Sequence, residues 1–348
     1  MLKKFLSMKL LQLIEKHWYI KSNPLLTILL TPFSIIYGLI VRIRTIMFQV
    51  NLKSSTKLSV PVVVVGNIGV GGAGKTPLTK HIAEELLKSK IQVGIILRGY
   101  KGSSKAPRIV YANDDSLEVG DEALIYAQAG YRVAIGAKRV DAGKTLLAHY
   151  PDTQLLLADD GLQHYYLQRD FEICVIDSSR IFGNKQLLPL GPLRESVSRL
   201  HSVNAIVING DYNSAKLNHA LSKYHNIPTY YQQLEFIHLY NPVLKISKSI
   251  QDFQHEKVLL MAAIGNPRRF FDYLAKLGLN ITETQFFPDH YHYQAADIDP
   301  EYAIITTEKD YTKLAKFNAP NIWIAVVKAK LNNELLISSI KNLVIKGN

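Results

Sequence analysis

Short runs of consecutive apolar, often β-branched residues recur along the chain and alternate with segments of helical spacing. Such runs are typical of buried parallel strands, because a strand that is covered by helices on both faces has no polar side. The alternation predicts an α/β fold, a parallel sheet with helices on both faces. The predicted strands form two sets, residues 58–67, 92–98, 132–136, 155–160, 171–177 and 204–209, then residues 257–264, 281–287, 302–306 and 321–329.

The segment between the two sets of strands has neither pattern. Residues 211–226 are polar and predict a surface helix, and residues 229–240 are rich in Tyr and Gln and predict an extended linker. A length of 348 residues suggests about two domains. We therefore predict an N-terminal segment, a larger α/β domain, and a linker with a smaller C-terminal α/β domain, over residues 1–50, 51–228 and 229–348.

The N-terminal sixty residues hold most of the net charge of +12, since they carry nine basic side chains and one acid and leave only +4 for the rest. A nucleic-acid enzyme more often carries basic charge around its core, so we expect no nucleic-acid partner. Basic residues that flank an apolar stretch instead indicate contact with anionic lipid. The basic residues are Lys3, Lys4, Lys9, Lys16, Lys21, Arg42, Arg44, Lys53 and Lys57.

The apolar stretch covers residues 22–41 and contains no charged side chain. As one helix it would be about 30 Å long, enough to span a bilayer. However, Pro32 lies in its middle, and a polar stripe along the helix is typical of a helix lying in the membrane interface. We expect a membrane-associated helix and favour interfacial anchoring over a span, with a buried core helix as the third alternative. The stripe consists of Ser34, Gly38, Arg42, Thr45 and Gln49.

A Gly-rich loop follows the first predicted strand and matches the pattern of phosphate-binding loops. Residues 77–90 predict a helix that starts with Pro77, so the loop has the strand–loop–helix context that such a site requires. Backbone N–H groups would hold the β- and γ-phosphates of ATP, the lysine would neutralise them, and the threonine would ligate Mg²⁺. The loop consists of Gly69, Val70, Gly71, Gly72, Ala73, Gly74, Lys75 and Thr76.

Two acids end another predicted strand. Asp159 and Asp160 close the strand over residues 155–160, and Gln163 lies in the turn that follows. An acid at the end of a strand beside a phosphate loop commonly anchors the metal ion in phosphoryl transfer. We therefore expect at least one of the two aspartates in the shell of the metal or the phosphates.

Two more polar segments could contribute residues to a functional site. Asp121 and Glu122 open a helix predicted over residues 122–129, where capping by Asp121 is the first interpretation and catalysis the second. Residues 288–293 read Pro-Asp-His-Tyr-His-Tyr, and two histidines beside an acid in one loop favour a functional site.

Two arginines are candidates for contact with phosphate. Arg98 ends the second predicted strand at the carboxyl edge that carries the phosphate loop, and ligands bind at this edge in open α/β sheets. Arg194 follows a loop rich in Pro and Gly, from which it could reach a phosphate or remain solvated at the surface.

Together the motifs resemble the tetraacyldisaccharide 4′-kinase family, membrane-associated enzymes of lipid A biosynthesis. The resemblance covers nearly the whole chain, although Leu162 and Ala123 replace an expected aromatic residue and a proline. It implies transfer of the ATP γ-phosphate to the 4′-hydroxyl of an acylated glucosamine disaccharide 1-phosphate, at the cytoplasmic face of the bacterial inner membrane. The motifs lie at residues 69–77, 119–122, 159–164, 188–195, 264–267, 289–290 and 307–310.

The resemblance also implies roles for individual residues. Asp121 becomes the leading candidate for the general base, with His290 orienting it from the C-terminal part and Lys75 holding the phosphates. Arg98 and Arg194 suit the substrate's phosphate. The division of the acids between base and metal stays open. The residues expected to organise Mg²⁺ are Thr76, Glu122, Asp159, Asp160 and Gln163.

The main alternative is a P-loop regulatory NTPase that acts as a membrane-associated switch or a metallochaperone. Switches of this class with an in-trans lysine carry Lys directly after the first Gly of the loop, where this chain has Val70. A GTPase would usually show Asn/Thr-Lys-x-Asp, and in residues 307–310 the Lys stands one place late. The kinase interpretation is therefore favoured.

Overall fold

A computed structural model describes residues 13–100, 102–104, 106–289 and 291–347 of the chain. The strands of the first part are β1 (Val62–Gly66), β2 (Val93–Leu97), β3 (Arg108–Val110), β4 (Arg132–Ile135), β5 (Leu155–Asp159), β6 (Phe171–Asp177) and β7 (Ala205–Asn209). Those of the second part are β8 (Thr229–Asn241), β9 (Ile246–Lys248), β10 (Val258–Ala262), β11 (Glu283–Phe286), β12 (Ala303–Thr306) and β13 (Ile322–Leu331).

Within the described residues these thirteen strands join one sheet, in the order β11-β10-β12-β13-β8-β7-β6-β1-β5-β2-β4-β3, and β9 pairs with β8. Most neighbours are parallel, and the antiparallel pairs are β3 with β4, β8 with β13 and β8 with β9. Every predicted strand is present, and the predicted α/β fold is confirmed. The short strands β3 and β9 were not predicted.

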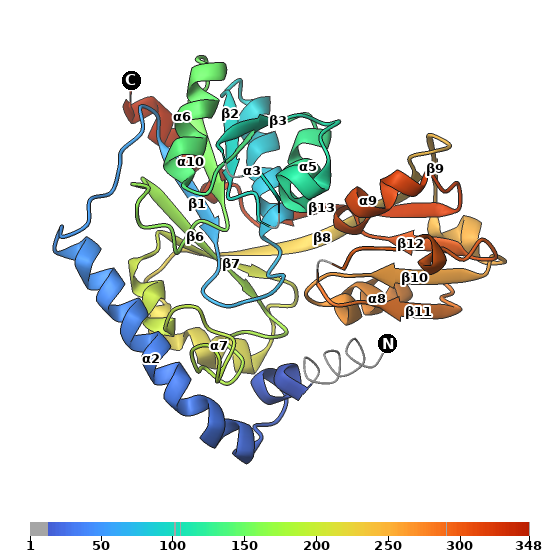
Figure 1. Cartoon of the computed structure of the whole chain (residues 1–348), viewed down its shortest axis with the longest axis horizontal. Helices are drawn as coiled ribbons and strands as arrows, with labels where there is room; N and C mark the ends of the chain where they lie inside the picture. The colour runs from blue at the N-terminus through green and yellow to red at the C-terminus, as the bar shows by residue number, and fades with distance from the viewer. Residues whose placement is uncertain (1–12, 101, 105, 290, 348) are drawn as a thin grey trace.

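The long strand β8 connects the two parts of the sheet (Figure 1). Its first residues pair in parallel with β7, and residues 232–240 pair with β13. Residues 229–240 are extended and connect the two parts, as predicted, but they form a strand that is hydrogen-bonded into the sheet and not a free linker. The division of the chain into domains at this segment stays a prediction.

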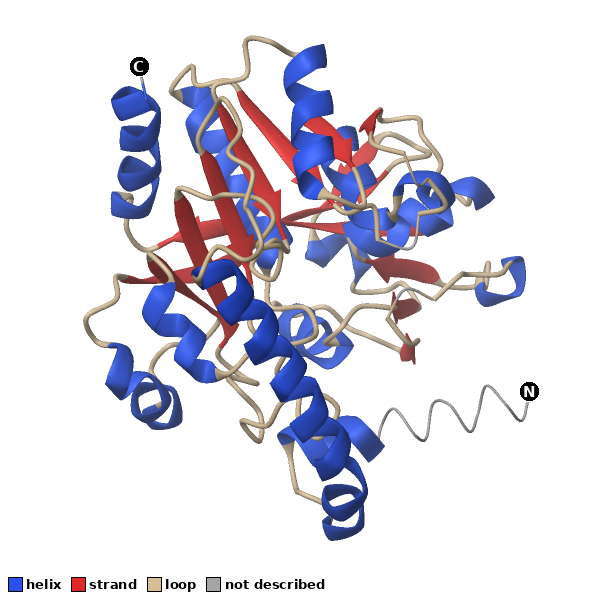
Figure 2. Cartoon of the chain, turned by 60° about the vertical axis from the view of Figure 1, so that its left-hand side comes forward, coloured by secondary structure: helices blue, strands red, loops and turns tan. Residues whose placement is uncertain are grey.

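Helices cover both faces of the first part of the sheet (Figures 1 and 2). Successive side chains of a strand point to opposite faces, so an all-apolar strand such as β1 needs helices on both sides. Val63 and Val65 belong to the core with α3 (Lys75–Lys88), α5 (Asp121–Gln128) and α10 (Leu335–Gly347). Val62 and Val64 belong to the core with α6 (Arg139–His149) and α7 (Ala215–Leu221).

The second part of the sheet is also covered on both faces. Leu260 shares a core with Leu274 of α8 (Pro267–Lys276), and Leu259 shares another with Leu314 of α9 (Glu308–Leu314). The C-terminal helix α10 returns to the first part and packs beside α3. The short helices are α4 (Ser116–Val119), η1 (Val197–Ser202), η2 (Ser222–Tyr224), η3 (Ile250–Phe253), η4 (Ala295–Asp297) and η5 (Ala315–Phe317).

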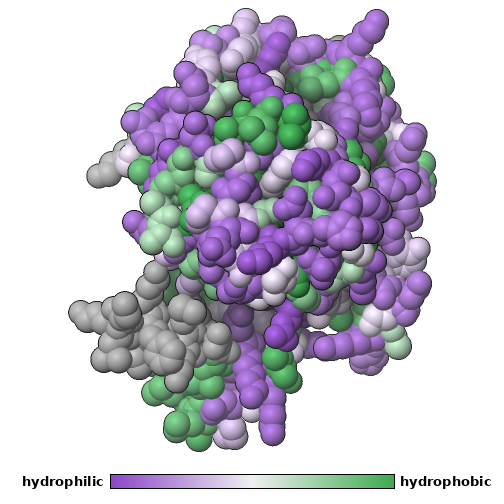
Figure 3. Space-filling model, turned by 90° about the vertical axis from the view of Figure 1, so that its right-hand side faces the viewer, coloured by the Kyte–Doolittle hydropathy of each residue, from purple (hydrophilic) through white to green (hydrophobic). Residues whose placement is uncertain are grey.

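The N-terminal helix α2 (Pro24–Gln49) lies along one side of the molecule (Figures 1 and 2). Its length and composition would allow it to cross a membrane. Only 6% of its most apolar 18-residue stretch is buried. The alternative of a buried core helix is therefore wrong. Figure 3 shows a mostly hydrophilic face on which hydrophobic residues gather in the upper half and at the lower edge.

One face of α2 is docked on the body of the protein. Ser34 Oγ donates to the Leu187 carbonyl at 2.9 Å, and Tyr37 Oη donates to the Arg194 carbonyl at 3.0 Å. Further along, the Arg44 guanidinium lies 5.5 Å from the centre of the Tyr165 ring. The predicted polar stripe coincides with this docked face only in part, since Ser34 is docked but Arg42 and Gln49 are exposed. Tyr37 and Arg44, which are outside the stripe, face the body.

Candidate active site

The phosphate-binding loop joins β1 to α3 and is fixed from β7 and β8. Asn209 Nδ2 donates to the Ala73 carbonyl at 2.9 Å, and Gln232 Nε2 donates to the Gly74 carbonyl at 3.2 Å. Gly74 has φ 90°, and a Cβ there would lie 2.0 Å from Asn209 Nδ2, so this position requires glycine. Helix α3 begins at Lys75, two residues before the predicted start.

Lys75 and Arg194 converge on one aspartate. Lys75 Nζ lies 3.2 Å from Asn67 Oδ1 and 3.4 Å from Asp160 Oδ1. Arg194 Nη1 lies 2.9 Å from both carboxylate oxygens of Asp160. Burial opposes ionisation of this carboxyl, but the two cations outweigh burial and lower its pKa. Asp160 is therefore an anion between the phosphate loop and the Arg194 loop.

Asp159, at the end of β5, has a different environment. Its side chain is 1% exposed, and its Oδ2 accepts from Tyr126 Oη at 2.7 Å. Burial, followed by the nearby Glu122 carboxylate, raises the pKa of Asp159 to about 7. Arg139 of α6 holds the backbone of Asp159 and Asp160, since its Nη2 donates to their backbone carbonyls at 2.8 and 2.9 Å.

The two acids of α5 face different neighbours. Gly120 precedes the helix with φ 87°, so Asp121 is its first helical residue and not the predicted N-cap. Asp121 Oδ2 lies 3.7 Å from Lys313 Nζ, and Glu122 Oε1 lies 3.8 Å from Lys309 Nζ. Both lysines belong to α9, so the second part of the sheet contacts the start of α5. His290 lies outside the described residues.

A cleft of about 1650 Å³ brings most of the predicted site residues together. It is lined by residues 70–76 of the phosphate loop and, on α5, by Glu122 but not by Asp121. Tyr37 and Arg44 of α2 line it from one side, and residues 264–266 line it from the second part. The other predicted residues in its lining are Arg98, Asp159, Asp160, Gln163 and Arg194.

Gln163 links the cleft to a buried carboxylate. Its Nε2 donates to the Asn67 carbonyl at 3.1 Å and to Glu195 Oε2 at 2.9 Å, and its Oε1 accepts from Arg194 at 3.4 Å. Tyr165 Oη also donates to Glu195. Within the described residues, no three His, Cys, Asp or Glu side chains converge as a metal site. Such convergence is not needed for Mg²⁺, which binds through one or two carboxylates plus phosphates and water.

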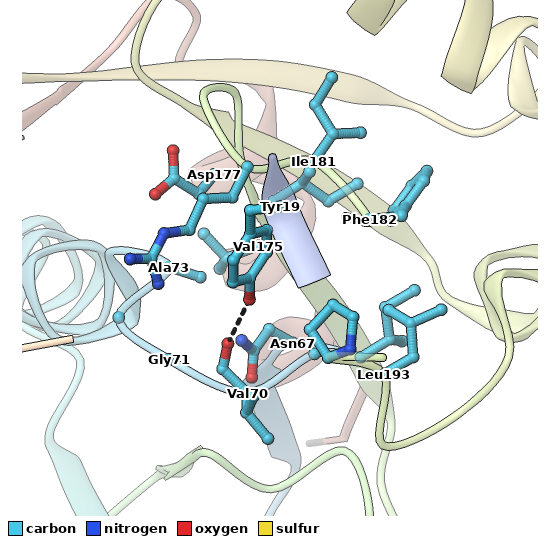
Figure 4. A pocket seen from close by; sticks show the side chains of 16 residues that line it. Tyr19, Asn67, Val70, Gly71, Ala73, Val175, Asp177, Ile181, Phe182 and Leu193 are labelled. Carbon is cyan, nitrogen blue, oxygen red and sulfur yellow. Dashed lines mark hydrogen bonds between the residues drawn. The ribbon is translucent and has the colours of Figure 1, made fainter. Parts of the chain in front are cut away.

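The N-terminal segment reaches the back of the phosphate loop. Figure 4 shows Tyr19 directed at Val70, and its Oη lies 3.5 Å from the Val70 carbonyl oxygen. The Arg180 guanidinium lies 4.7 Å from the centre of the Tyr19 ring. A Cβ at Gly71 would lie 3.3 Å from Arg180 Nη1, so the arginine borders the loop. The sequence gives no local signal of these contacts.

Three kinds of comparison with known proteins agree. The family model described as tetraacyldisaccharide-1-P 4′-kinase matches residues 26–344. Proteins named tetraacyldisaccharide 4′-kinase are 41% identical in Chromobacterium violaceum, over 93% of this chain and 96% of the relative, and 41% identical in Hamiltonella defensa, over 95% and 98%. A crystal structure of LpxK from Aquifex aeolicus in complex with ATP matches with a TM-score of 0.74 at 28% identity, covering 91% of this chain and 98% of that one.

The chain belongs to the tetraacyldisaccharide-1-P 4′-kinase family. The predicted family and the predicted enzyme class, a tetraacyldisaccharide 4′-kinase of lipid A biosynthesis, are therefore confirmed. The regulatory switch and the metallochaperone are set aside, because neither fits a family match over nearly the full chain.

Arg269 of α8 follows the Gly265-Asn266-Pro267 turn, and the sequence makes it a candidate for phosphate contact in the same way as Arg194. It places Nη2 3.1 Å from Asn209 Oδ1 and Nη1 3.3 Å from Asp177 Oδ1. Two residues at the site of this kinase were missed by the sequence reasoning. Arg139 supports both aspartates of β5 from α6. Asn209 ends β7, and a polar residue at the carboxyl end of a parallel strand was the available signal for it.

Proposed function

We propose that the cleft binds ATP through residues 70–76 and transfers its γ-phosphate to the 4′-hydroxyl of an acylated glucosamine disaccharide 1-phosphate. The observation that carries this proposal is the convergence of the phosphate loop, Glu122 and Asp159 on one cleft beside α2. Backbone N–H groups at the start of α3 suit the β- and γ-phosphates, and Lys75 would neutralise their charge.

The oxygen-rich donor set suits Mg²⁺, which prefers carboxylate, hydroxyl and phosphate oxygens. Thr76, Glu122 and Asp159 would hold it, while Asp160 and Gln163 would orient the groups around it. Support comes from geometry, since Asp159 ends β5 and lines the cleft together with Thr76 and Glu122. When bound, Mg²⁺ would neutralise charge that develops on the phosphoryl oxygens.

Asp121 is the proposed general base for the acceptor hydroxyl. A sugar hydroxyl is a weak nucleophile, so a carboxylate that accepts its proton as the bond to phosphorus forms would speed the reaction. Asp121 stands at the first turn of α5 beside Glu122, at the meeting point of the two parts of the molecule. His290 is the proposed partner that would orient this carboxylate.

The arginines that line the cleft suit the phosphate of the acceptor. Arg98 and Arg194 are both in the lining, and guanidinium groups bind phosphate through paired hydrogen bonds. Arg194 also bridges to Asp160, so it could contact a phosphate while it holds that aspartate. Arg44 brings a further cation from α2 to the same cleft.

Helix α2 is the proposed membrane anchor at the cytoplasmic face of the bacterial inner membrane. Its docked face runs from Ser34 to Phe48, so the helix axis lies against the body while the apolar side chains of its outer face are exposed. This arrangement favours a helix that lies in the interface over one that crosses the bilayer. The acceptor has four acyl chains and stays in the membrane, so the kinase must work there.

The proposed activity is tested by incubating the protein with radiolabelled ATP, Mg²⁺ and disaccharide 1-phosphate in mixed micelles. We expect the label in a bisphosphorylated lipid. Mild acid hydrolysis should remove the 1-phosphate first and leave the label on the lipid. Label released only as inorganic phosphate would contradict the proposal.

Replacing Ile36 and Ile40 by glutamate should weaken membrane association. Both side chains are more than half exposed on the outer face of α2, so each would leave the interface on substitution. Losing two apolar side chains that would otherwise insert among the lipids should lower the vesicle partition coefficient by roughly tenfold or more. Co-sedimentation with anionic vesicles measures it. The matched control is Ile237→Glu, at an exposed isoleucine of β8, and partitioning of the double variant equal to this control would contradict the anchor.

A further inference from the structure

Helix α9 has a buried lysine in its last turn, Lys313. The Lys313 side chain is 4% exposed, which is rare for lysine unless its ammonium group is paired. Its Nζ lies 3.2 Å from Asp310 Oδ1 on the same helix and 3.7 Å from Asp121 Oδ2 on α5. It also lies 5.5 Å from the centre of the buried Tyr293 ring. One ammonium group therefore bridges two carboxylates that come from the two parts of the molecule.

The carboxylate on the α9 side is fixed. Asp310 is fully buried, and its Oδ2 accepts from the Ala263 N–H at 3.1 Å and from Thr307 Oγ1 at 2.8 Å. Thr307 in turn caps α9 by accepting from the Asp310 N–H. Because its other oxygen is held by the backbone after β10 and by the cap, Asp310 anchors Lys313 firmly to the second part of the sheet.

The carboxylate on the α5 side belongs to the residue proposed as the base. Asp121 has a side chain that is 11% exposed, so it is partly withdrawn from water. An ammonium group on a rigid support restricts the rotation of a neighbouring carboxylate, and catalytic groups need their geometry held within about 0.5 Å. Lys313 is well suited to supply this restriction from across the interface.

We propose that Lys313 is a positioning residue that orients the Asp121 carboxylate toward the acceptor hydroxyl. This inference rests on the proposed role of Asp121 as the base. In this arrangement Asp310 holds Lys313, and Lys313 holds one oxygen of Asp121, so the second part of the molecule completes the site on the first. Lys313 itself is not among the residues that line the cleft.

Other ion pairs of α9 allow a positioning role to be separated from a purely structural one. Lys80 Nζ of α3 lies 2.9 Å from Glu308 Oε2 of α9, an acid that is not among the proposed base or metal residues. Lys309 Nζ lies 3.1 Å from Asp289 Oδ1 and 3.8 Å from Glu122. The Lys80 pair links the two parts as the Lys313 pair does, so Lys80→Met is the matched control.

The test compares steady-state kinetics of the full-length variants with disaccharide 1-phosphate as acceptor. Lys313→Met should lower kcat by about tenfold to a hundredfold while the KM for ATP changes less than about twofold. Lys313→Arg, which retains the cation, should recover part of the loss, and Lys80→Met should keep kcat within about twofold. Thermal unfolding of each variant reports its fold, and Lys313→Gln replaces Lys313→Met if the latter does not fold.

A double variant decides whether Lys313 acts through Asp121. In the Asp121→Asn background, Lys313→Met should cause no further loss, because residues that act as a unit are non-additive. Equal losses in both backgrounds, or wild-type kcat in the single variant, would overturn the inference. Normal turnover of Asp121→Asn alone would instead refute the base assignment, so the two failures are distinguishable.

Discussion

Replacing Lys75 by alanine should abolish phosphoryl transfer and leave the fold intact. The Lys75 ammonium lies between Asn67 and Asp160 at the start of α3, where the phosphates of ATP are proposed to bind. Removing this cation leaves the charge of the transferred phosphoryl group uncompensated, and we expect turnover to fall by at least about 10³-fold. The measurement is the rate of label transfer from ATP to lipid under saturating acceptor.

The control for this variant is Lys88→Ala, at an exposed lysine near the end of the same helix that pairs with Glu84 and Glu85. It should keep normal turnover, because its pairs are at the surface and far along α3 from the loop. Arg194 still pairs with Asp160 when Lys75 is absent, so the unfolding temperature of Lys75→Ala should stay close to that of the wild type. Normal turnover of Lys75→Ala would refute the phosphate-loop assignment.

Asp121→Asn should lower turnover by roughly 10²-fold or more with ATP binding retained. The amide keeps the size of the side chain but cannot accept a proton, so only the chemical step should suffer. Turnover is measured with saturating substrates, and Mg²⁺–ATP affinity by calorimetry. Glu118→Gln, at an exposed acid of α4, is the control and should behave as the wild type.

A different outcome would assign Asp121 to the metal. If Mg²⁺–ATP affinity collapses while bound substrate reacts at the normal rate, Asp121 holds the ion, and Glu122 becomes the candidate base. The geometry gives a reason to make this comparison, since Glu122 lines the cleft and Asp121 faces Lys313.

The docking of α2 connects the proposed membrane anchor with the residues of the cleft. Tyr37 binds the backbone of Arg194, whose side chain binds Asp160, which pairs with Lys75. The helix that is proposed to reach the membrane is thus two residues away from the phosphate loop. A lipid held at the surface of the membrane would meet the cleft at its α2 side.

Much of the fold could be predicted because its strands are apolar and short. The runs at residues 62–66 and 155–159 need helices on both faces whatever their neighbours are, so pattern alone identified them as parallel strands. Strand β8 could not be identified in this way. Its buried Gln232 binds the Gly74 carbonyl and lies near Asn209, and polar residues satisfied by distant partners look like solvent-exposed residues in a sequence.

The spacing of residues along the chain identified the family and predicted the phosphate loop and the candidate acids after β5 and at the start of α5. These features depend on local spacing, which sets backbone geometry within a few residues. The tertiary structure alone decided that Asp160 is held by Lys75 and Arg194 while Asp159 is buried against Tyr126. It also decided that Lys313 meets Asp121 and that α2 docks through Tyr37. The physical reason is that burial and charge pairing join residues far apart in the chain, and local patterns contain no information about such partners.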